Sequence, residues 1–408
     1  MGAPLFGDLP ANGYDLRNAS DKSWVSRDTL YSSAAKTLSN VEVAPAPFSL
    51  SGIDVADTVY SGQTVDLSTT IQMADSKTPT AAKPLTVQFT VNGTAGKEQT
   101  ISSAFSGSKT ITDTFTANRT GEISITLKVS YGDDYYILRT LSRSITQCSH
   151  PGLIQRDGKY YCSVCGRAAE AELTQNGVVN ASYIDFADAL KAAQAEENSG
   201  CTVKLLSDVI APATTSITNA DSKNLCISAG TFTFDLGGHT LYMESFPQEL
   251  EISGTANVTL KNGTVYQRGN DTDMAGAIHV KGGTLNLSAN THGGTFKGEQ
   301  QNFIYYAITV SSGGNLTVSG GTHEGGVNVL EKSTGTVKLL GGTFTLNTNM
   351  GYSLQNRQNE SNSKVSDLLG ENCIFVTTGD TPRKLTENEY SGTVVKMDVR
   401  VILHDQHH

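Results

Sequence analysis

The sequence has few charged residues and no long apolar run. Only 17% of its 408 residues are charged, and the net charge of −10 leaves no excess of positive side chains. Binding to nucleic acid or to anionic lipid depends on such an excess, so neither is expected here. No stretch approaches the ~20 apolar residues that cross a bilayer. Nothing after Met1 resembles a secretion signal.

The composition is instead rich in glycine, threonine, serine and asparagine, with 40 glycines. It disfavours helical bundles and coiled coils and is typical of extracellular β proteins. The start has no leader, and the end at His407-His408 has no closing motif. We therefore expect a piece of a larger secreted or cell-wall-attached protein, without its signal and anchor. A complete cytosolic protein is the alternative.

Residues 48–147 consist of short alternating runs separated by turn residues. Ile123 and Leu127 lie on one face of such a run, and Ser124 lies on the other. A period of two predicts half-buried strands, and six or seven of them without a helical pattern predict a β-sandwich. The segment has no cysteine, so it has no inter-sheet disulfide. Residues 1–47 are expected to be an irregular segment or linker.

Four residues of metal-ligand type follow the predicted sandwich. Cys148, His150, Cys162 and Cys165 have the spacing C-x-H-x11-C-x2-C. Thiolates and imidazole suit tetrahedral zinc, and four protein ligands leave no position for water. The predicted zinc is therefore structural. It would stabilise an insert, residues 148–170, that is too short to build its own core.

Alternative fates of the cysteines stay open. The three cysteines of this motif could instead form a disulfide, which suits an extracellular protein, or act as a redox pair. The disulfide leaves one thiol unpaired and gives His150 no role. Free thiols in or near the core are expected for Cys201, Cys226 and Cys373, although a Cys201–Cys226 disulfide is possible.

A helix is predicted over residues 182–198, with Ser182 as the N-cap. Apolar residues recur there at helical spacing, and Gly200 ends the pattern. A strand, residues 202–209, follows at once. We assign residues 171–200 to a linker and capping helix.

Beyond residue 225 a unit of three short strands recurs, with a glycine corner before the third strand. The repeat length is roughly 20–30 residues. Single units of this kind cannot bury their apolar face, so they stack on one another, as in a parallel β-helix. We expect the β-helix to cover residues 201–380. Residues 381–408 should form a capping strand and tail, because an uncapped end exposes a pairing edge.

The alternation assigns each strand position to the inside or the outside. One inward column is Leu225, Leu250, Ile278, Ile308 and Val327. The other is Leu241, Val265, Phe296, His323 and Phe344. One outward column is Cys226, Glu251, His279, Thr309 and Asn328, and the other is Asp235, Thr259, Asn286, Thr317 and Lys338.

Several motifs together carry a family resemblance. They are FADALKAAQ, TVKLLSDV, FDLGGHTL, the GGT corners and DLLGENCIF. Over about residues 180–400 the chain resembles the pectin-lyase-like, right-handed parallel β-helix surface proteins of Gram-positive gut bacteria. Residues 48–147 resemble the immunoglobulin-like spacer repeats of bacterial surface proteins. The resemblance implies extracellular display and adhesion or host interaction, and it does not imply catalysis.

The residues themselves give little support to an enzyme. A lyase or hydrolase on a β-helix needs carboxylates that cluster in one outward column over adjacent coils. The predicted columns contain no such cluster, so no catalytic residue is assigned. Glu251 beside His279 is the nearest approach. Asp271 and Asp273 lie in a polar loop that could chelate calcium but is expected to be merely solvated.

We therefore predict an all-β protein that works as a non-catalytic, adhesin-like binding module. Its partner is expected to be a host protein, such as immunoglobulin, mucin or matrix, or a glycan, and not nucleic acid or membrane. Two other functions stay open, namely a polysaccharide lyase or glycoside hydrolase and a structural stalk. Candidate ligand-binding residues are Phe303, Tyr305, Tyr306, Glu251 and His279. The three aromatic residues could equally pack on the outside of a coil.

Overall fold

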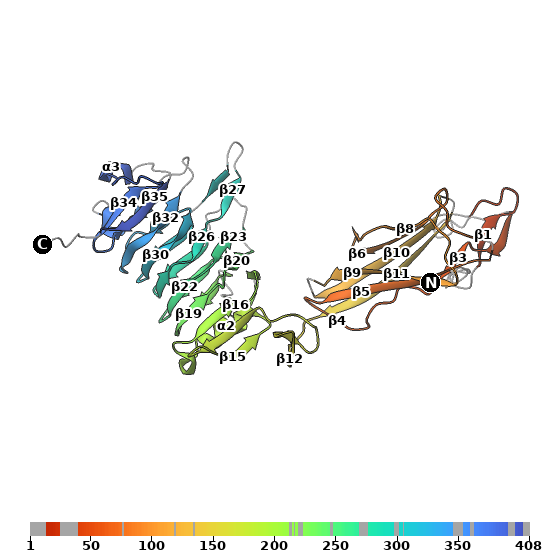
Figure 1. Cartoon of the computed structure of the whole chain (residues 1–408), viewed down its shortest axis with the longest axis horizontal. Helices are drawn as coiled ribbons and strands as arrows, with labels where there is room; N and C mark the ends of the chain where they lie inside the picture. The colour runs from red at the N-terminus through yellow and green to blue at the C-terminus, as the bar shows by residue number, and fades with distance from the viewer. Residues whose placement is uncertain are drawn as a thin grey trace. The chain divides into compact units, whose positions relative to one another are not determined.

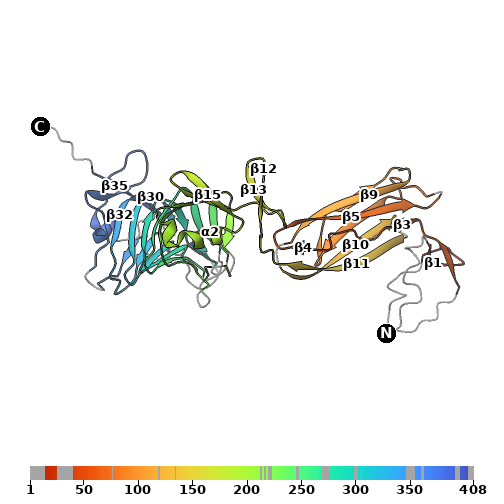
Figure 2. The same cartoon turned by 90° about the horizontal axis from the view of Figure 1, so that it is seen from below.

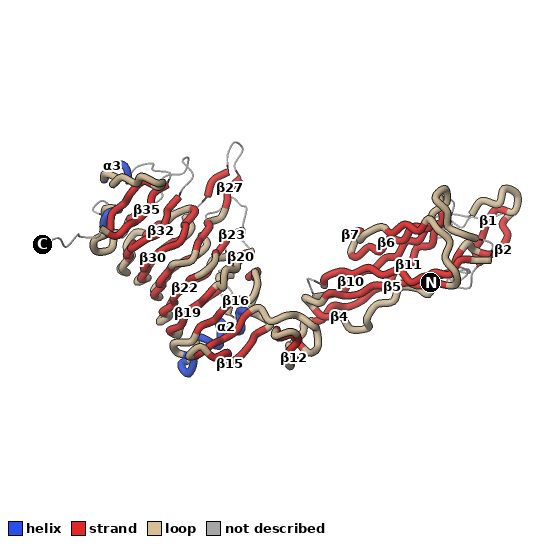
Figure 3. Tube along the Cα trace, viewed as in Figure 1, coloured by secondary structure: helices blue, strands red, loops and turns tan. Residues whose placement is uncertain are grey.

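A computed structural model of the protein describes most of the chain. The described residues are 14–24, 40–75, 77–117, 120–133, 135–211, 214, 215, 217, 218, 223–244, 248–268, 276–297, 302–304, 306–345, 354–359, 363–390 and 396–402, with the backbone alone at 14, 295–297 and 302–304. Strands dominate and helices are few and short (Figure 3), which confirms the all-β class. None of the helices in this part of the chain is long and apolar enough to cross a membrane.

The chain divides into two compact units. The first comprises Met1–Ile154 with Cys162–Arg167, and the second comprises Gln155–Tyr161 with Ala168–His408. Each is described separately below.

Two β-sheets enclose the core of the first unit. One contains β3 (Phe48–Leu50), β5 (Thr64–Met73) and β9 (Ser108–Thr116). The other contains β4 (Val59–Tyr60), β11 (Tyr135–Thr146), β10 (Gly121–Tyr131), β6 (Leu85–Val91), β7 (Thr94–Ala95) and β8 (Gln99–Ile101). Leu67 and Phe89, from opposite sheets, are both 1% exposed and belong to one apolar cluster. The predicted two-layer arrangement is therefore present.

Part of the amino-terminal segment is regular, contrary to the expectation of an irregular linker. β1 (Tyr14–Asn18) and β2 (Val41–Pro45) pair antiparallel. The ring of Trp24 packs edge-on against Tyr135, with 4.8 Å between the ring centroids. The Tyr135 hydroxyl donates a hydrogen bond of 3.0 Å to Asp15 Oδ2. These contacts join the segment to the sandwich.

The part of the second unit after Ala168 starts with a hairpin where a linker was expected. β14 (Ala171–Gln175) and β15 (Val178–Tyr183) are joined by Asn176 and Gly177, both with positive φ, as in a type I′ turn. Helix α2 (Phe186–Ala193) then starts after Asp185, and a 3₁₀ turn, η1 (Glu196–Asn198), follows it. The predicted N-cap was wrong because Ser182 still belongs to β15.

The coils of this unit are built from three stacks of parallel strands. Strands of the first two stacks are labelled in Figure 1, and Figure 2 shows the same coils from below. The first contains β16 (Thr202–Leu205), β19 (Thr231–Asp235), β22 (Asn257–Lys261), β25 (Thr284–Leu287) and the first halves of β30 (Asn315–Glu324) and β32 (Val337–Thr345). The second contains β17 (Val209–Ala211), β20 (Thr240–Met243), β23 (Thr264–Gln267), β26 (Asn290–His292) and the second halves of β30 and β32. The third contains β18 (Leu225–Ile227), β21 (Leu250–Ser253), β24 (Ile278–Lys281), β29 (Ile308–Ser311), β31 (Val327–Val329) and β33 (Leu354–Asn356). Each coil adds one strand to each stack.

The first inward column is confirmed, and the second needs one correction. Leu225 to Val327 pair in register, as predicted, and all five residues are fully buried. In the second column Thr291, not Phe296, lies between Val265 and His323. In that coil no Gly-Gly pair directly precedes β26, the strand of the second stack that contains Thr291. Phe296 lies instead in β27 (Thr295–Lys297), which pairs antiparallel with β28 (Asn302–Ile304).

The outward columns show one similar slip. Cys226, Glu251, His279, Thr309 and Asn328 stack as predicted. In the other column Thr233 takes the place of Asp235 beside Thr259. Phe232 and Phe234 are the inward residues of β19, so its register is two residues earlier than predicted. Asp235 instead faces Lys261, with 3.6 Å between Oδ2 and Nζ.

Antiparallel pairing closes the last coil. After η3 (Val365–Leu368), β34 (Cys373–Thr377) and β35 (Lys396–Val401) pair with each other, and β35 also pairs with β32. A short helix, α3 (Glu387–Tyr390), lies between them in the sequence. β35 thus occupies the position expected of a capping strand.

His323 is a polar residue in an otherwise apolar interior. It is fully buried, and its ring stacks on Phe344 with 5.0 Å between centroids. Nε2 lies 3.0 Å from the carbonyl oxygen of Gly320, which only accepts, so Nε2 carries the proton. Nδ1 then accepts from the Thr291 hydroxyl at 3.0 Å. Burial, only partly opposed by the Gly320 carbonyl, lowers the pKa of His323 to about 4.

The buried imidazole makes the stability of the second unit depend on pH. Since its pKa is below the unfolded value, the unfolded chain binds the proton first, and stability falls as the pH drops from about 6.5 towards 4. We expect an extra loss of about 2 kcal/mol between pH 7 and pH 5 relative to a Thr291→Val/His323→Leu variant. Urea unfolding of both proteins at the two pH values measures this difference. Equal losses would contradict the assignment.

Candidate metal centre

The structure brings the four predicted ligands together. Cys148 and His150 follow β11, while Cys162 ends β13 (Lys159–Cys162) and Cys165 lies in the next turn. One donor atom from each lies within 4.8 Å of the other three. Among the residues that the structure describes, they form the one group of three or more cysteine, histidine or acidic side chains so arranged. The group could hold a metal ion.

The pairwise distances describe a compact but unbonded set of donors. Cys148 Sγ lies 3.7 Å from Cys162 Sγ, and Cys165 Sγ lies 3.5 Å from His150 Nδ1. A disulfide needs about 2.05 Å between its sulfurs, so these thiols are not bonded to each other. Cys148, Cys162 and Cys165 are at most 4% exposed. The donors thus face inward and away from water.

Local backbone geometry shapes this knuckle. The N–H groups of Val164 and Cys165 point at Cys162 Sγ, with N–S distances of 3.4 and 3.5 Å. The His150 N–H makes the same contact, 3.4 Å long, with Cys148 Sγ. Gly166 has φ of 72°, the left-handed conformation that glycine adopts without strain. N–H groups directed at sulfur favour the thiolate, which is the form that binds metals.

A tight hairpin supplies the second half of the ligand set. β12 (Leu153–Arg156) and β13 are joined by Asp157 and Gly158, with φ of 50° and 76°. Positive φ at both positions identifies a type I′ turn, for which Asp-Gly is a preferred sequence. This hairpin was missed from the sequence, although the dipeptide was a usable signal. It places Cys162 opposite the segment that carries Cys148 and His150.

The electrostatics of the cluster favour a bound cation. Burial acts to raise the pKa of Cys162, but the N–H groups of Cys165 and Val164 and the side chain of His150 outweigh it and lower the pKa to about 6. Burial, together with the Cys162 and Cys148 side chains, raises the pKa of Cys165 to about 12. The Cys162 and Cys148 side chains thus oppose ionisation of Cys165. A divalent cation would remove that opposition by neutralising the thiolates.

The cluster is also tied to the sandwich of the first unit. The Arg167 side chain passes over Gly62, where a Cβ would lie only 2.3 Å from Arg167 Cδ. Gly62 has φ of 83°, so glycine is suited to the position on two grounds. The segment that carries the ligands therefore packs against the backbone of the sandwich at Gly62 through Arg167.

The predicted ligand-binding residues are described only in part, and two of them, Glu251 and His279, are neighbours in register. Glu251 is 6% exposed and accepts a hydrogen bond of 3.0 Å from Asn224. Tyr306 donates its hydroxyl to Gln355 at 3.1 Å, so it lies along the outside of a coil. Tyr305, like Asp271 and Asp273, lies outside the described residues, and Phe303 is described by its backbone alone. His279 contacts Ser311, with Nε2 2.7 Å from Oγ.

None of the other three cysteines is in a disulfide. Cys201 is fully buried and Cys373 is 8% exposed, while Cys226 is half-buried in β18. The Cys201–Cys226 disulfide left open by the sequence is therefore not formed. Burial raises the pKa of Cys201 and that of Cys373. These two behave as small apolar residues.

Sequence reasoning also missed an aromatic column on the outside of the second stack. We use this name for Tyr242, Tyr266 and His292, which occupy equivalent outward positions in successive coils. The rings of Tyr266 and His292 stack at 4.2 Å, and the Tyr242 ring meets Tyr266 edge-on at 5.8 Å. The Arg268 guanidinium lies 3.7 Å from the centre of the Tyr242 ring. The column was missed because it required the correct register of β26, which contains His292.

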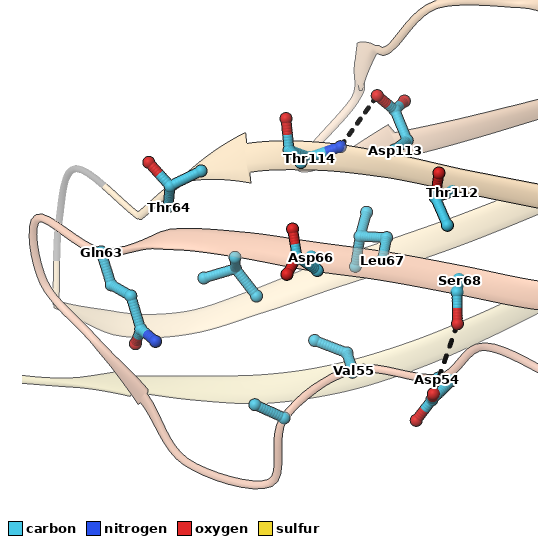
Figure 4. Close-up of a pocket in the computed structure, with 12 residues that line it drawn as sticks. Asp54, Val55, Gln63, Thr64, Asp66, Leu67, Ser68, Thr112, Asp113 and Thr114 are labelled. Atoms are coloured by element: carbon cyan, nitrogen blue, oxygen red, sulfur yellow. Dashed lines mark hydrogen bonds between the residues drawn. The ribbon is translucent and has the colours of Figure 1, made fainter. Parts of the chain in front are cut away.

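A second missed feature is an acidic groove on the sandwich, over β5 and β9 (Figure 4). Asp54, Asp66 and Asp113 line it with several threonines. Asp54 accepts a hydrogen bond from Ser68, and Asp113 accepts one from the Thr114 N–H. These three carboxylates come from strands and loops that each looked unremarkable in the sequence. They do not converge as the cysteine cluster does.

Comparison with known proteins gives little further guidance. No family model matches the chain, and no curated protein matches it. A crystal structure of the CARDB domain of the PF1109 protein from Pyrococcus furiosus, in complex with di-metal ions, is 17% identical over 25% of this chain and 94% of that one, with a TM-score of 0.21. A solution NMR structure of the same domain is 15% identical over 24% and 94%, with a TM-score of 0.21.

Cobalt binding tests the ligand set. Co²⁺ in a tetrahedral thiolate site gives sulfur-to-metal charge-transfer bands, and we expect them to saturate at about one equivalent. Cys165→Ser should weaken binding at least about tenfold, since even outer-shell changes have effects of this size. Cys201→Ser, which removes a buried thiol of the second unit, is the matched control and should leave the titration unchanged. Equal losses in both variants would contradict the assignment.

Proposed function

We propose that the protein is a cell-surface binding module of the adhesin type, secreted or attached to the wall of a Gram-positive bacterium. In chain order it would comprise an immunoglobulin-like sandwich, a zinc-held insert and a right-handed parallel β-helix. The three in-register stacks around one apolar interior support the β-helix. One face of it would bind a host protein, such as immunoglobulin, mucin or matrix, or a glycan.

Zinc is the proposed metal because three thiols and an imidazole are its usual donors and two of the donor distances fit it. Tetrahedral zinc, with bonds of about 2.3 Å to sulfur and about 2.0 Å to nitrogen, has S–S edges of about 3.8 Å and S–N edges of about 3.5 Å. The corresponding distances here are 3.7 Å for Cys148–Cys162 and 3.5 Å for Cys165–His150. Three sulfurs and one imidazole leave no open coordination position, so the role would be structural.

Elemental analysis tests the metal's identity. Protein purified without chelator should carry about one equivalent of zinc per chain. Removing it should increase hydrogen exchange over residues 148–167, because metal binding supplies the folding energy of such a small element. Exchange in β22 and β25 of the second unit serves as the internal control. Less than half an equivalent of zinc would count heavily against this identity.

The aromatic column is the observation that carries the binding proposal. Its rings lie on an outward sheet face and not in the apolar interior, and Ile210, one coil before Tyr242, is 44% exposed. Charged groups flank the rings: Arg268 lies over Tyr242, and Glu324 Oε2 lies 3.2 Å from His292 Nε2. Aromatic rings beside charged hydrogen-bonding groups suit recognition of sugars and of protein side chains.

A binding screen tests this proposal. The full chain should bind saturably to one component of an array of host glycans, mucins, matrix proteins and immunoglobulins. A Tyr242→Ala/Tyr266→Ala variant should lose at least about tenfold in affinity, or about 1.4 kcal/mol. Tyr136→Ala, in β11 of the sandwich, is the control. Retained affinity in the double variant would move the site away from the aromatic column, and the absence of any ligand would favour a stalk.

A further inference from the structure

Three polar side chains from successive coils form a relay on the outside of the third stack. His279 Nε2 lies 2.7 Å from Ser311 Oγ, and its Nδ1 lies 3.5 Å from Glu249 Oε2. His279 lies in β24, Ser311 ends the neighbouring β29, and Glu249 immediately precedes β21 on the other side. The relay therefore runs diagonally across three adjacent strands. Neither the zinc site nor the aromatic column uses any of these residues.

The carboxylate of the relay is itself held in place. Glu249 Oε1 accepts a hydrogen bond of 2.7 Å from the Gly276 N–H, and the Glu249 N–H donates to Asn224 Oδ1 at 3.0 Å. A Cβ at Gly276 would lie 2.9 Å from Glu249 Oε1 and equally close to the carbonyl oxygen of Tyr306. Glycine at this position thus permits the approach of the carboxylate. Glu249 is fixed at both its backbone and its side chain.

The arrangement decides where the proton of the imidazole lies. A carboxylate only accepts hydrogen bonds, so Glu249 holds the proton on Nδ1. Nε2 is then the acceptor, and the Ser311 hydroxyl donates to it. The side chains of Glu249 and His279 are only 14% and 19% exposed, which shields the relay from water. A distance of 3.5 Å is long for a hydrogen bond, but such contacts tighten when the imidazole becomes charged in the reaction.

We propose that Ser311 is an activated nucleophile that hydrolyses carboxylic esters, an activity beyond the binding function proposed above and independent of it. Ser311 Oγ attacks the carbonyl carbon while its proton passes to His279 Nε2. The tetrahedral intermediate expels the alcohol, which takes that proton, and leaves an acyl-serine. Water then attacks the acyl carbon and gives a proton through His279 back to Ser311, releasing the carboxylic acid. Glu249 acts as a positioning residue.

The surroundings indicate what kind of ester fits. Lys281 is exposed and in register with Ser311 on the adjacent strand, so its flexible side chain can bring positive charge to an ester bound at Ser311. That charge would stabilise the oxyanion. Ser311 sits at the end of a strand on an outer face of the β-sheet. An outer face admits an ester carried on a long polymer, such as an acylated glycan, as readily as a small one.

A fluorophosphonate probe tests the nucleophile directly, because it phosphonylates activated serines and spares ordinary ones. Peptide mass spectrometry of the labelled full chain should locate the phosphonyl group on Ser311. Ser253 is the matched control, since it faces Lys281 in register from the opposite side but has no such relay. Ser253→Ala should label normally, and Ser311→Ala should not label. His279→Gln should label at least tenfold more slowly.

The positioning role of Glu249 has its own readout. Glu249→Gln should slow labelling at least tenfold, and Glu249→Asp should restore part of the rate, which a purely structural hydrogen bond would not require. Hydrolysis of p-nitrophenyl acetate should follow the same order of variants. Labelling of Ser311 no faster than that of Ser253, or than that of heat-denatured protein, would overturn the proposal. Site mapping on the unmodified chain keeps this result independent of how the variants fold.

Discussion

The structure of the second unit depends on parallel pairing in register between successive coils. Each inward residue, such as Leu250 or Ile278, pairs in register with the equivalent residues of its neighbouring coils and belongs to one apolar cluster. Register also determines the outside, because equivalent side chains are then about 4.8 Å apart. This spacing brings together Glu249, His279 and Ser311, although the chain between them makes two full turns. The aromatic column arises in the same way.

The metal cluster has the opposite physical basis. Its four donor groups lie within 4.8 Å of one another, and the Cys162 and Cys148 side chains oppose ionisation of Cys165. The N–H groups directed at Cys162 and the burial of Cys165 act on ionisation in opposite directions. The two parts of the chain therefore respond differently to their surroundings. The stacked coils depend on exclusion of water, whereas the cluster is a set of donors that could hold a metal ion.

Much of this could be predicted from the sequence, and the failures have specific causes. Alternation with period two located the inward residues, and ligand spacing located Cys148, His150, Cys162 and Cys165. Phe296 was assigned to an inward column because it follows a Gly-Gly pair. The residue at that position is Thr291 of β26, which no Gly-Gly pair directly precedes. The relay could not be predicted. Its residues are offset by two positions from one coil to the next. The alternation of inward and outward residues does not reveal such diagonal contacts.

Both ends of the stacked region are closed by antiparallel strands. β14 pairs with β16 at the first coil, and β35 pairs with β32 at the last. The described coils between them meet their neighbours through the same parallel interface, and the antiparallel pair β27–β28 is an addition within one coil. A coil could therefore be duplicated or deleted by recombination without disturbing either end. The length of the stacked region is open to change in steps of one coil while the closing elements stay the same.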